Sequence, residues 1–393
     1  MLNTPFSPWP SFSAEEGDAV RRVLMSNRVN YWTGTETREF EQEFAQWCGT
    51  SHAIALANGT LALDLALKAC GIGPGDEVIV TPRTYIASVS CVVNAGAMPV
   101  FADVDPDSGN LTADTIRAVL SPRTRAIVCV HLGGWPCDMD PIMSLAEQHE
   151  ITVIEDCAQA HGARYKGRSV GSIGHIGAWS FCQDKIMTTG GEGGMITTND
   201  ERLWSLMWSY KDHGKSYDAV YRRKHPPGYG FRWLHESFGT NWRMLEMQAV
   251  VGRLQLGLMP GWHAQRTANA NAILNVAREC AALHAPTPSP DIEHAFYRCY
   301  LQIRPERLAA GWTRDRVVDE INAAGVPCFH GACPEVYLEK AFDGHRSRPA
   351  ERLPNAQRLG EVSMMFLVHP TLTDSEVGKT CDAIRSVLTA ALG

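Results

Sequence analysis

The sequence predicts an α/β protein with a large domain on a mainly parallel sheet and a smaller α/β domain on its C-terminal side. One reason is the alternation of short apolar runs with helical patterns between residues 52 and 154. Another is the length of 393 residues, which exceeds one ordinary compact domain. The composition, 45% hydrophobic and 20% charged, is typical of a soluble globular protein. We expect domains at residues 1–255 and 256–393.

Two helices are predicted to open the chain. Ser13 and Glu16 fit a capping box in front of apolar residues with helical spacing. Phe40 and Phe44 then fall on one face of a second helix, and Gly49 follows as a natural helix end.

The alternation that follows predicts the core of the large domain. Strands joined by helices pair in parallel, with helices on both faces of the sheet. Such sheets bind ligands at the carboxyl ends of their strands. The strands are expected at 52–56, 77–81, 99–102, 125–130 and 152–154, and the helices at 61–69, 86–95, 114–120 and 140–149.

The rest of the chain is predicted in less detail. Residues 208–240 show no period and are rich in Tyr, Gly and basic residues, which indicates a long irregular, functional loop. A helix over 243–254 is expected to lead toward the small domain. That domain should contain a strand near 300–303, a helix near 314–324 and a closing helix near 374–388.

Charge and composition exclude several classes of function. The net charge of −7 argues against nucleic acid as a partner. The sequence shows no signal peptide and no apolar run of membrane-spanning length, so we expect no membrane partner. The twelve cysteines are scattered without a Cys-x-x-Cys pair, which gives no indication of a zinc site. They indicate reduced thiols and a cytoplasmic location.

The first candidate site is Asn58-Gly59-Thr60, where the first strand of the alternation meets its helix. The backbone N–H groups at the helix start, through Leu61, together with the Thr60 hydroxyl, suit a phosphate group. An Asn-Gly turn with an N-cap explains the same residues without a ligand.

The second candidate is Asp156, just past the carboxyl end of a predicted core strand. A carboxylate in that place can pair with a protonated ring nitrogen of a cofactor. The alternative is an aspartate that caps a turn.

The third candidate is the segment from Ser180 to Lys185, followed by a glycine-rich run over 190–194. Ser180 can offer a hydroxyl to a phosphate, and the glycines allow close backbone approach. A lysine that forms a Schiff base must lose its proton, and we expect a partly buried cationic site to lower the pKa of Lys185. A solvated lysine before a flexible turn is the alternative.

Taken in order, these motifs resemble the nucleotide-sugar aminotransferases of the DegT/StrS type. The resemblance rests on Asn58-Gly59-Thr60, on residues 155–162, on Ser180-Phe181 with Lys185 and Glu192-Gly193-Gly194, and on residues 239–244. It implies a fold-type I pyridoxal 5′-phosphate (PLP) transferase that works as a homodimer with shared active sites. It also implies an amino group moved from glutamate to a nucleotide-linked keto-sugar, such as a 3- or 4-keto-6-deoxyhexose, for amino-sugar or polysaccharide biosynthesis.

The resemblance also implies roles for single residues. Lys185 is the expected Schiff-base lysine and proton shuttle, and Asp156 the partner of the cofactor ring nitrogen. The remaining cofactor contacts are expected from Gly59, Thr60, Leu61 and Ser180 at the phosphate, Gln159 at the ring hydroxyl, Tyr85 stacked on the ring and Asn241 from the partner subunit.

Substrate recognition is less well defined by the sequence. Arg222 and Arg223 form a local basic cluster, and we expect them to hold the nucleotide diphosphate. A solvated basic loop is an equal alternative. His330 is a candidate substrate contact, although residues 327–334 depart from the family's histidine- and tyrosine-rich pattern, and Thr240 stands where many members have Tyr. These departures put the identity of the sugar in doubt.

Three other functions fit parts of the pattern. A PLP sugar dehydratase on the same scaffold would have histidine in place of Lys185. An aminotransferase for a free cyclitol ketone shares the same cofactor residues. A non-catalytic regulator with this fold would be expected to lose Asp156 or Lys185, and both are present.

Overall fold

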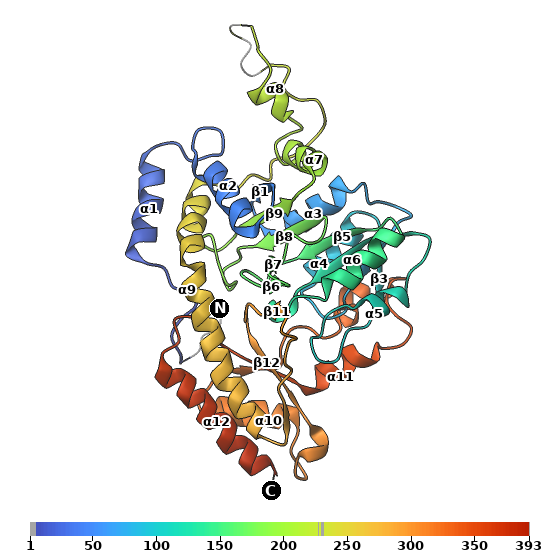
Figure 1. Cartoon of the computed structure of the whole chain (residues 1–393), viewed down its shortest axis with the longest axis vertical. Helices are drawn as coiled ribbons and strands as arrows, with labels where there is room; N and C mark the ends of the chain where they lie inside the picture. Colours follow the sequence, from blue (N-terminus) through green and yellow to red (C-terminus); the bar gives the residue numbers. More distant parts are fainter. Residues whose placement is uncertain (1–4, 227, 229–231, 393) are drawn as a thin grey trace.

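The computed structural model describes residues 5–226, 228 and 232–392. A seven-stranded sheet forms the centre of the chain, and a four-stranded sheet lies toward the C-terminus (Figure 1). The long helix α9 (Glu246–Glu279) runs beside both sheets and packs against helices from either end of the chain.

The large sheet is mainly parallel, as predicted. Its strand order is β1-β9-β8-β5-β4-β2-β3, and only β9 runs antiparallel to its neighbours. The link from β8 to β9 carries no helix, so β9 returns antiparallel beside β8. The strands are β1 (His52–Leu56), β2 (Glu77–Val80), β3 (Met98–Phe101), β4 (Thr124–Val130), β5 (Thr152–Asp156), β8 (Ile176–Ser180) and β9 (Gly194–Thr198).

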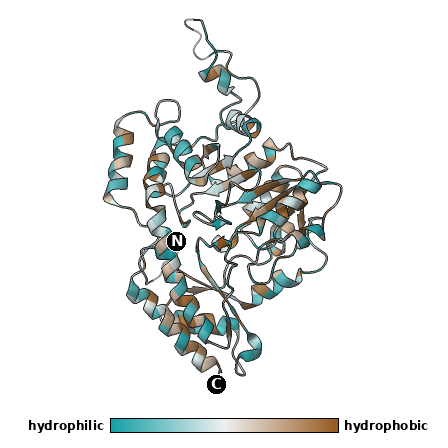
Figure 2. Ribbon diagram, viewed as in Figure 1, coloured by the Kyte–Doolittle hydropathy of each residue, from teal (hydrophilic) through white to brown (hydrophobic). Residues whose placement is uncertain are grey.

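Helices cover both faces of this sheet because its strands are apolar on both sides. In β4, Val128 packs into the core with the helices of one face, whereas Ile127 and Cys129 pack with those of the other. The brown strands at the centre of Figure 2 show this apolar interior. One face holds α3 (Gly59–Ala69), α4 (Ala87–Asn94) and α7 (Glu201–Lys211), and the other α5 (Ala113–Arg117) and α6 (Met139–Gln148).

The two opening helices form as their sequences predict. In α1 (Ala14–Met25), Ser13 and Glu16 make both hydrogen bonds of the capping box. Helix α2 (Glu36–Cys48) buries Phe40 and Phe44 and ends at Gly49, whose φ of 76° is left-handed.

The prediction of an irregular segment over 208–240 is partly wrong. Helix α7 continues to Lys211, and α8 (Tyr217–Tyr221) forms a further short helix. The amino-acid pattern is misleading here because a lysine normally indicates an exposed position. Lys211 is instead fully buried, with its ammonium 2.8 Å from Glu41. The described residues after α8 carry no helix or strand up to α9, and α8 projects from the body at the top of Figure 1.

Helix α9 is far longer than the predicted helix over 243–254. Gly252, Gly257 and Pro260 weaken the helical signal after residue 251. Packing against α1, α2 and α12 nevertheless holds the helix together through Glu279. The expected boundary between residues 255 and 256 falls inside α9, and the division into two domains stays a prediction.

The C-terminal region is an antiparallel sheet of order β10-β12-β14-β13 covered by helices. The strand and both helices predicted in this region are confirmed. A three-stranded sheet, β11-β6-β7, lies apart from the other two. No helix of the described residues is long and apolar enough to cross a membrane. The elements are β10 (Leu283–His284), β12 (Cys299–Ile303), β13 (Cys328–Phe329), β14 (Ser363–Phe366), α10 (Arg314–Ala323), α11 (Pro354–Val362), α12 (Asp374–Leu392), β6 (Arg164–Tyr165), β7 (Arg168–Ser169) and β11 (Ile292–Glu293), with 3-10 helices at Leu132–Gly134, Pro305–Arg307, Val336–Leu338 and Lys340–Phe342.

Candidate active site

The carboxyl ends of β1, β5 and β8 meet at one edge of the large sheet. Asp156 pairs with Ala178 in the register of β5 and β8, so Asp156 and Ser180 end neighbouring strands. A cavity of about 580 Å³ opens at this edge. Eight residues predicted from the sequence line it together: Gly59, Thr60, Leu61, Tyr85, Asp156, Gln159, Ser180 and Lys185.

Helix α3 presents its N-terminus to the cavity. Asn58 caps the helix, and its side-chain oxygen accepts a hydrogen bond from the Leu61 N–H at 3.0 Å. The N–H groups of Gly59 and Thr60 belong to the first turn, where no intrahelical acceptor exists. Two backbone donors and the positive end of the helix dipole therefore face an anion bound here.

Glycine lets this helix start lie against β8. A Cβ atom on Gly59 would come within 2.5 Å of Ser180 Cβ. A Cβ atom on Gly194 would lie 2.3 Å from the Asn58 carbonyl oxygen. The cradle of α3, Ser180 and these glycines brings a hydroxyl and free N–H groups to one place, so its donor set fits the phosphate of PLP.

Asp156 ends β5 at the bottom of the cavity and is only 5% exposed. Its carboxylate accepts hydrogen bonds from the Ser88 hydroxyl at 2.7 Å and from the Ala158 N–H at 3.1 Å. Burial raises the pKa of Asp156, although both hydrogen bonds lower it. A buried carboxylate of this kind gains from a cationic partner, which fits a protonated pyridine ring.

Two further residues line the wall between Asp156 and the cavity mouth. The side-chain oxygen of Gln159 accepts a hydrogen bond from the Gly133 N–H at 2.7 Å, which fixes the orientation of the amide. The Tyr85 side chain lines the cavity but is 70% exposed in the single chain. Its predicted stacking on the cofactor ring stays a prediction.

Lys185 lies on the link from β8 to β9, with a side chain 16% exposed. Its Nζ is 3.8 Å from Asp184 Oδ1 and 5.1 Å from the centre of the Tyr297 ring. The other Asp184 oxygen accepts a hydrogen bond from the Tyr297 hydroxyl and lies 3.8 Å from the Arg298 guanidinium. The Trp9 indole N–H donates to the Lys185 carbonyl at 2.8 Å and holds the backbone. The lysine is therefore positioned by its neighbour Asp184 and by residues from two distant parts of the chain.

The charges around Lys185 correct one expectation from the sequence. Burial lowers the pKa of Lys185, but Tyr297 and Asp184 outweigh burial and leave that pKa raised. Burial also raises the pKa of Asp184, and here Lys185 and Tyr297 reverse the effect and lower it. The Asp184 carboxylate beside this amine favours an ammonium ion, the opposite of the lowered pKa that the sequence predicted.

The structure does not bring the other predicted residues into this cavity. Asn241 is exposed and bridges to Asp212 through its backbone. His330 lies 3.3 Å from Asp315 and is 57% exposed. Arg222 and Arg223, at the C-terminal end of the projecting helix α8, pair with Asp218 and Glu236. None of the four lines the cavity of its own chain.

Several residues of the site were not predicted. Ser88 and Asp184 both lie within three residues of a predicted site residue, and this closeness in the sequence could have pointed to them. Tyr297 and Arg298 carry no local signal, because only the fold brings them to Lys185. Cys182 and Glu192 also line the cavity.

One cavity at the edge of a mainly parallel sheet thus holds a buried aspartate at a strand end, a lysine and the start of α3, and a second, antiparallel sheet lies toward the C-terminus. This arrangement is that of a fold-type I PLP-dependent transferase. The chain belongs to the DegT/DnrJ/EryC1/StrS aminotransferase family, whose sequence profile it matches over residues 10–385. The predicted family, fold class and enzyme class are thereby confirmed.

Related proteins match nearly the whole chain. GDP-perosamine synthase of Caulobacter vibrioides is 39% identical, covering 96% of this chain and 97% of the relative. The dTDP-3-amino-3,4,6-trideoxy-alpha-D-glucose transaminase of Streptomyces venezuelae is 35% identical, covering 95% and 92%. Among solved structures, the aminotransferase from Psychrobacter cryohalolentis is 63% identical, with a TM-score of 0.97 over 99% of this chain and 100% of that one.

Proposed function

We propose that this protein uses PLP to move an amino group from glutamate to a nucleotide-linked keto-sugar. The observation that carries the proposal is the cavity in which Asp156, Lys185, Ser180 and the start of α3 converge. Two relatives are named for a GDP-linked and a dTDP-linked sugar. Their names support a nucleotide-linked hexose as the acceptor class, with a 3- or 4-keto-6-deoxyhexose as the specific proposal.

The residues of the cavity divide the work. Bound PLP supplies an electron sink for the carbanion that forms when a substrate loses its α-proton. Asp156 would keep a proton on the ring nitrogen, and Gln159 would contact the ring hydroxyl. Gly59, Thr60 and Ser180 would hold the phosphate, with the α3 dipole behind them. The N–H of Leu61, the fourth predicted phosphate contact, is already donated to Asn58. Tyr85 would stack on the ring.

Lys185 is proposed as the proton carrier. Its Nζ must be neutral to accept the α-proton, and it would then release that proton to a carbon of the cofactor. The Asp184 carboxylate, held by Tyr297, lies beside this amine and stabilises its protonated form. Lys185→Ala should therefore abolish turnover while leaving the fold intact. Normal turnover in that variant would sink the assignment.

The visible absorption spectrum tests the first half-reaction without any sugar. Purified protein loaded with PLP is mixed with glutamate alone. We expect the long-wavelength band of the lysine-bound cofactor to give way to the spectrum of its amino form. A band that glutamate leaves unchanged would argue for another amino donor. Absence of any such band with PLP would contradict the role of Lys185.

A substrate panel tests the second half-reaction. Enzyme in the amino form is mixed with GDP- and dTDP-linked 3- and 4-keto-6-deoxyhexoses and with a free cyclitol ketone. Return of the lysine-bound spectrum with a nucleotide sugar supports the proposal and identifies the carbon. Return only with the cyclitol ketone would replace the acceptor class.

A homodimer with shared sites is the second part of the proposal. Asn241 is exposed and outside the cavity of its own chain, and α8 projects from the body (Figure 1). Large apolar side chains on the same stretch are exposed, with Phe238 at 100% and Trp233 at 74%. We infer that a second copy covers this stretch and that Asn241 reaches the partner's phosphate cradle.

Subunit complementation tests that inference. Lys185→Ala and Asn241→Ala are each expected to be inactive as purified. After mixing and reassociation, some dimers contain one subunit of each variant. In such a dimer, the Asn241→Ala subunit keeps its Lys185 and receives an intact Asn241 from the Lys185→Ala subunit, so one of the two sites is complete. Recovered activity supports shared sites. A monomer by light scattering, or no recovery in a proven mixed dimer, would contradict them.

The basic residues are proposed to act across the same interface. Arg222 and Arg223 are exposed at the end of α8 and do not line the cavity of their own chain, so we infer that they would bind the diphosphate at another copy's site. Neutralising both should raise the KM for the nucleotide sugar and leave the reaction with glutamate unchanged. An unchanged KM would refute this role. The substrate role of His330 and the cytoplasmic location stay predictions.

A further inference from the structure

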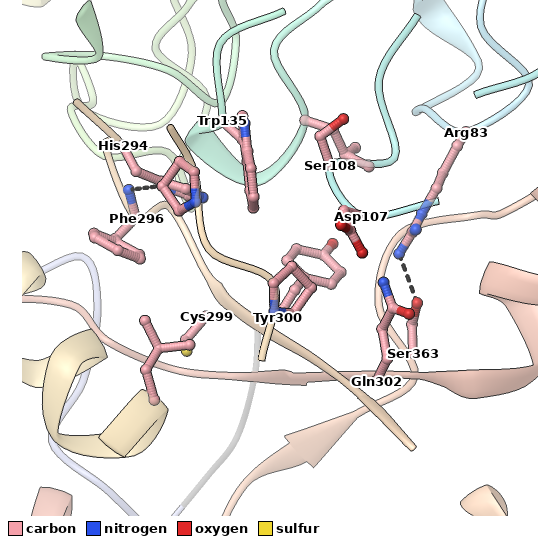
Figure 3. A pocket seen from close by; sticks show the side chains of 14 residues that line it. Arg83, Asp107, Ser108, Trp135, His294, Phe296, Cys299, Tyr300, Gln302 and Ser363 are labelled. Carbon is pink, nitrogen blue, oxygen red and sulfur yellow. Dashed lines mark hydrogen bonds between the residues drawn. The ribbon is translucent and has the colours of Figure 1, made fainter. Parts of the chain in front are cut away.

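A second cavity lies between the loop after β3 and the four-stranded sheet (Figure 3). None of its lining residues lines the cofactor cavity. It offers about 40 Å³ to water-sized groups. Because one water needs about 10–15 Å³ by this measure, the space suits about two or three heavy atoms. It is too small for a nucleotide or a sugar.

Arg83 is the principal polar group of this cavity and is only 4% exposed. Its Nη2 donates a hydrogen bond to Ser363 Oγ at 2.9 Å, as Figure 3 shows. Its Nε is buried and has no hydrogen-bond partner among the described residues. The guanidinium lies 5.4 Å from the centre of the Tyr300 ring. A neutral hydroxyl and an aromatic face are thus its identified partners.

The charge of Arg83 is not neutralised within the described part of the chain. Arginine stays protonated inside proteins, and no described carboxylate lies within ion-pair distance of this guanidinium. Burial lowers the pKa of Arg83. An uncompensated buried charge costs several kcal/mol, so a counter-ion at this position would be strongly favoured.

The other titratable groups at the cavity do not supply that counter-ion. The Asp107 side chain is 59% exposed and its carboxylate is bound by His284 at 2.7 Å. Burial lowers the pKa of His294 to about 3, so its ring is neutral at pH 7. The Tyr300 hydroxyl accepts a hydrogen bond from the Ala332 N–H at 3.1 Å.

We propose that this cavity binds a small monovalent anion, of the size of a halide or a one-carbon carboxylate, with Arg83 as its charge partner. The site is built from both sides: Arg83 comes from the loop after β2, and Tyr300, Gln302 and Ser363 come from the four-stranded sheet. A bound anion therefore holds the two sheets together and stabilises the folded chain.

Bromide and chloride are the probes. Crystals of the whole protein grown or soaked in sodium bromide should show an anomalous peak next to the Arg83 guanidinium. In solution, Tm is measured in sodium chloride and in sodium gluconate at equal ionic strength, because gluconate is too large for the cavity. The wild type should gain stability from chloride, and Arg83→Met should lose that gain. Arg253→Met is the control, because Arg253 already binds Glu36, Glu39 and Glu43.

One variant separates this proposal from its main rival, in which Asp107 neutralises Arg83. Asp107→Asn should strengthen the chloride response if Arg83 binds the anion, since a nearby negative charge is removed. A wild type without any chloride response, together with a response that appears only in Asp107→Asn, would overturn the proposal. Should Arg83→Met not fold, the bromide peak in the wild type decides the question, and its absence refutes the site.

Discussion

Asp184 Oδ1 lies 3.8 Å from the Nζ of Lys185, its neighbour in the sequence, and both residues line the cavity. Tyr297, 112 positions after Lys185, donates a hydrogen bond to the other oxygen of the same carboxylate. The segment that leads into β12 thus fixes a charge beside the Lys185 amine. This relationship controls how easily the lysine gives up its proton.

Asp184→Asn should make Lys185 easier to deprotonate. Burial lowers the pKa of Lys185, Tyr297 and Asp184 raise it, and the substitution removes one of the raising groups. The midpoint of the pH dependence of PLP capture should move to lower pH, and so should the acidic limb of kcat/KM. Stopped-flow absorbance across a pH series measures the first. Asp184→Glu keeps the charge and should stay near the wild-type midpoint; an unmoved midpoint in Asp184→Asn would contradict the argument.

Gly59→Ala should weaken cofactor binding. The added Cβ would lie 2.5 Å from Ser180 Cβ and 2.9 Å from Ser180 Cα, so the start of α3 must move away from β8. Overpacking of this kind costs about 1–3 kcal/mol. If this cost arises only in the PLP-bound form, it corresponds to a roughly 5- to 150-fold weaker binding of PLP. Titration of the apoenzyme with PLP measures it.

Gly17→Ala provides the matched control for that experiment. Gly17 lies in α1 with no atom within 4 Å of an added Cβ. Alanine there should leave PLP affinity unchanged and stabilise the helix by up to about 1 kcal/mol. Equal losses of affinity in the two variants would show that the effect is not specific to the cradle.

The residues that the sequence could identify are those whose role follows from local position. Asp156 ends a core strand and Gly59 starts a helix that the predicted strand–helix alternation contains, so that alternation brings both to one edge. Ser180 ends β8, a strand that the alternation did not include. A lysine before a glycine-rich run is by itself typical of a solvated turn, so the predicted role of Lys185 rests on the resemblance of the ordered motifs.

The features that the sequence could not provide depend on tertiary packing. Lys211 reads as a surface residue until Glu41, from another helix, pairs with it inside the protein. Pro260 reads as a helix break, yet α9 continues because neighbouring helices hold it. Tyr297 reaches Lys185 only because the chain returns to the large sheet there.

Ser88→Ala should impair the role of Asp156 without removing the residue. Burial raises the pKa of Asp156 and the Ser88 hydrogen bond lowers it, so loss of that bond raises the pKa further. As the pH is lowered, the Ser88→Ala variant should therefore lose activity at a higher pH than the wild type does. A hydrogen bond to a charged group contributes about 1.5–3 kcal/mol, so turnover near the limb should drop by about tenfold or more.

A pH–rate profile of kcat measures this effect. Ser90→Ala is the control, since the Ser90 hydroxyl makes only a long contact to the Ala87 carbonyl at 3.5 Å. Its profile should overlay that of the wild type. Identical profiles for Ser88→Ala and the wild type would show that Ser88 does not tune Asp156.

Glu155, beside Asp156 on β5, should be a major source of stability at neutral pH. Its fully buried carboxylate accepts bonds from the Ile173 and Gly174 N–H groups and from His131 Nε2. The Cys137 N–H donates to His131 Nδ1, so Nε2 carries the proton. All three partners of the Glu155 carboxylate are hydrogen-bond donors. In the Glu155→Gln variant the amide N–H₂ is also a donor, so at least one of these hydrogen bonds is lost. The free energy of unfolding should fall by about 1.5–3 kcal/mol.

The pH dependence of that loss identifies its cause. Burial raises the pKa of Glu155, but the His131 hydrogen bond and the backbone N–H groups outweigh burial and lower it. A lowered folded-state pKa gives stability above the unfolded value of about 4.3 that is lost as the pH falls through the folded one. Urea denaturation at pH 7 and at acid pH should therefore show the variant and the wild type converging. Glu147 is exposed, and Glu147→Gln is the control: it should change the free energy of unfolding by no more than about 0.5 kcal/mol at either pH. An equal loss of stability for Glu155→Gln at both pH values would mean that packing, not charge, is responsible.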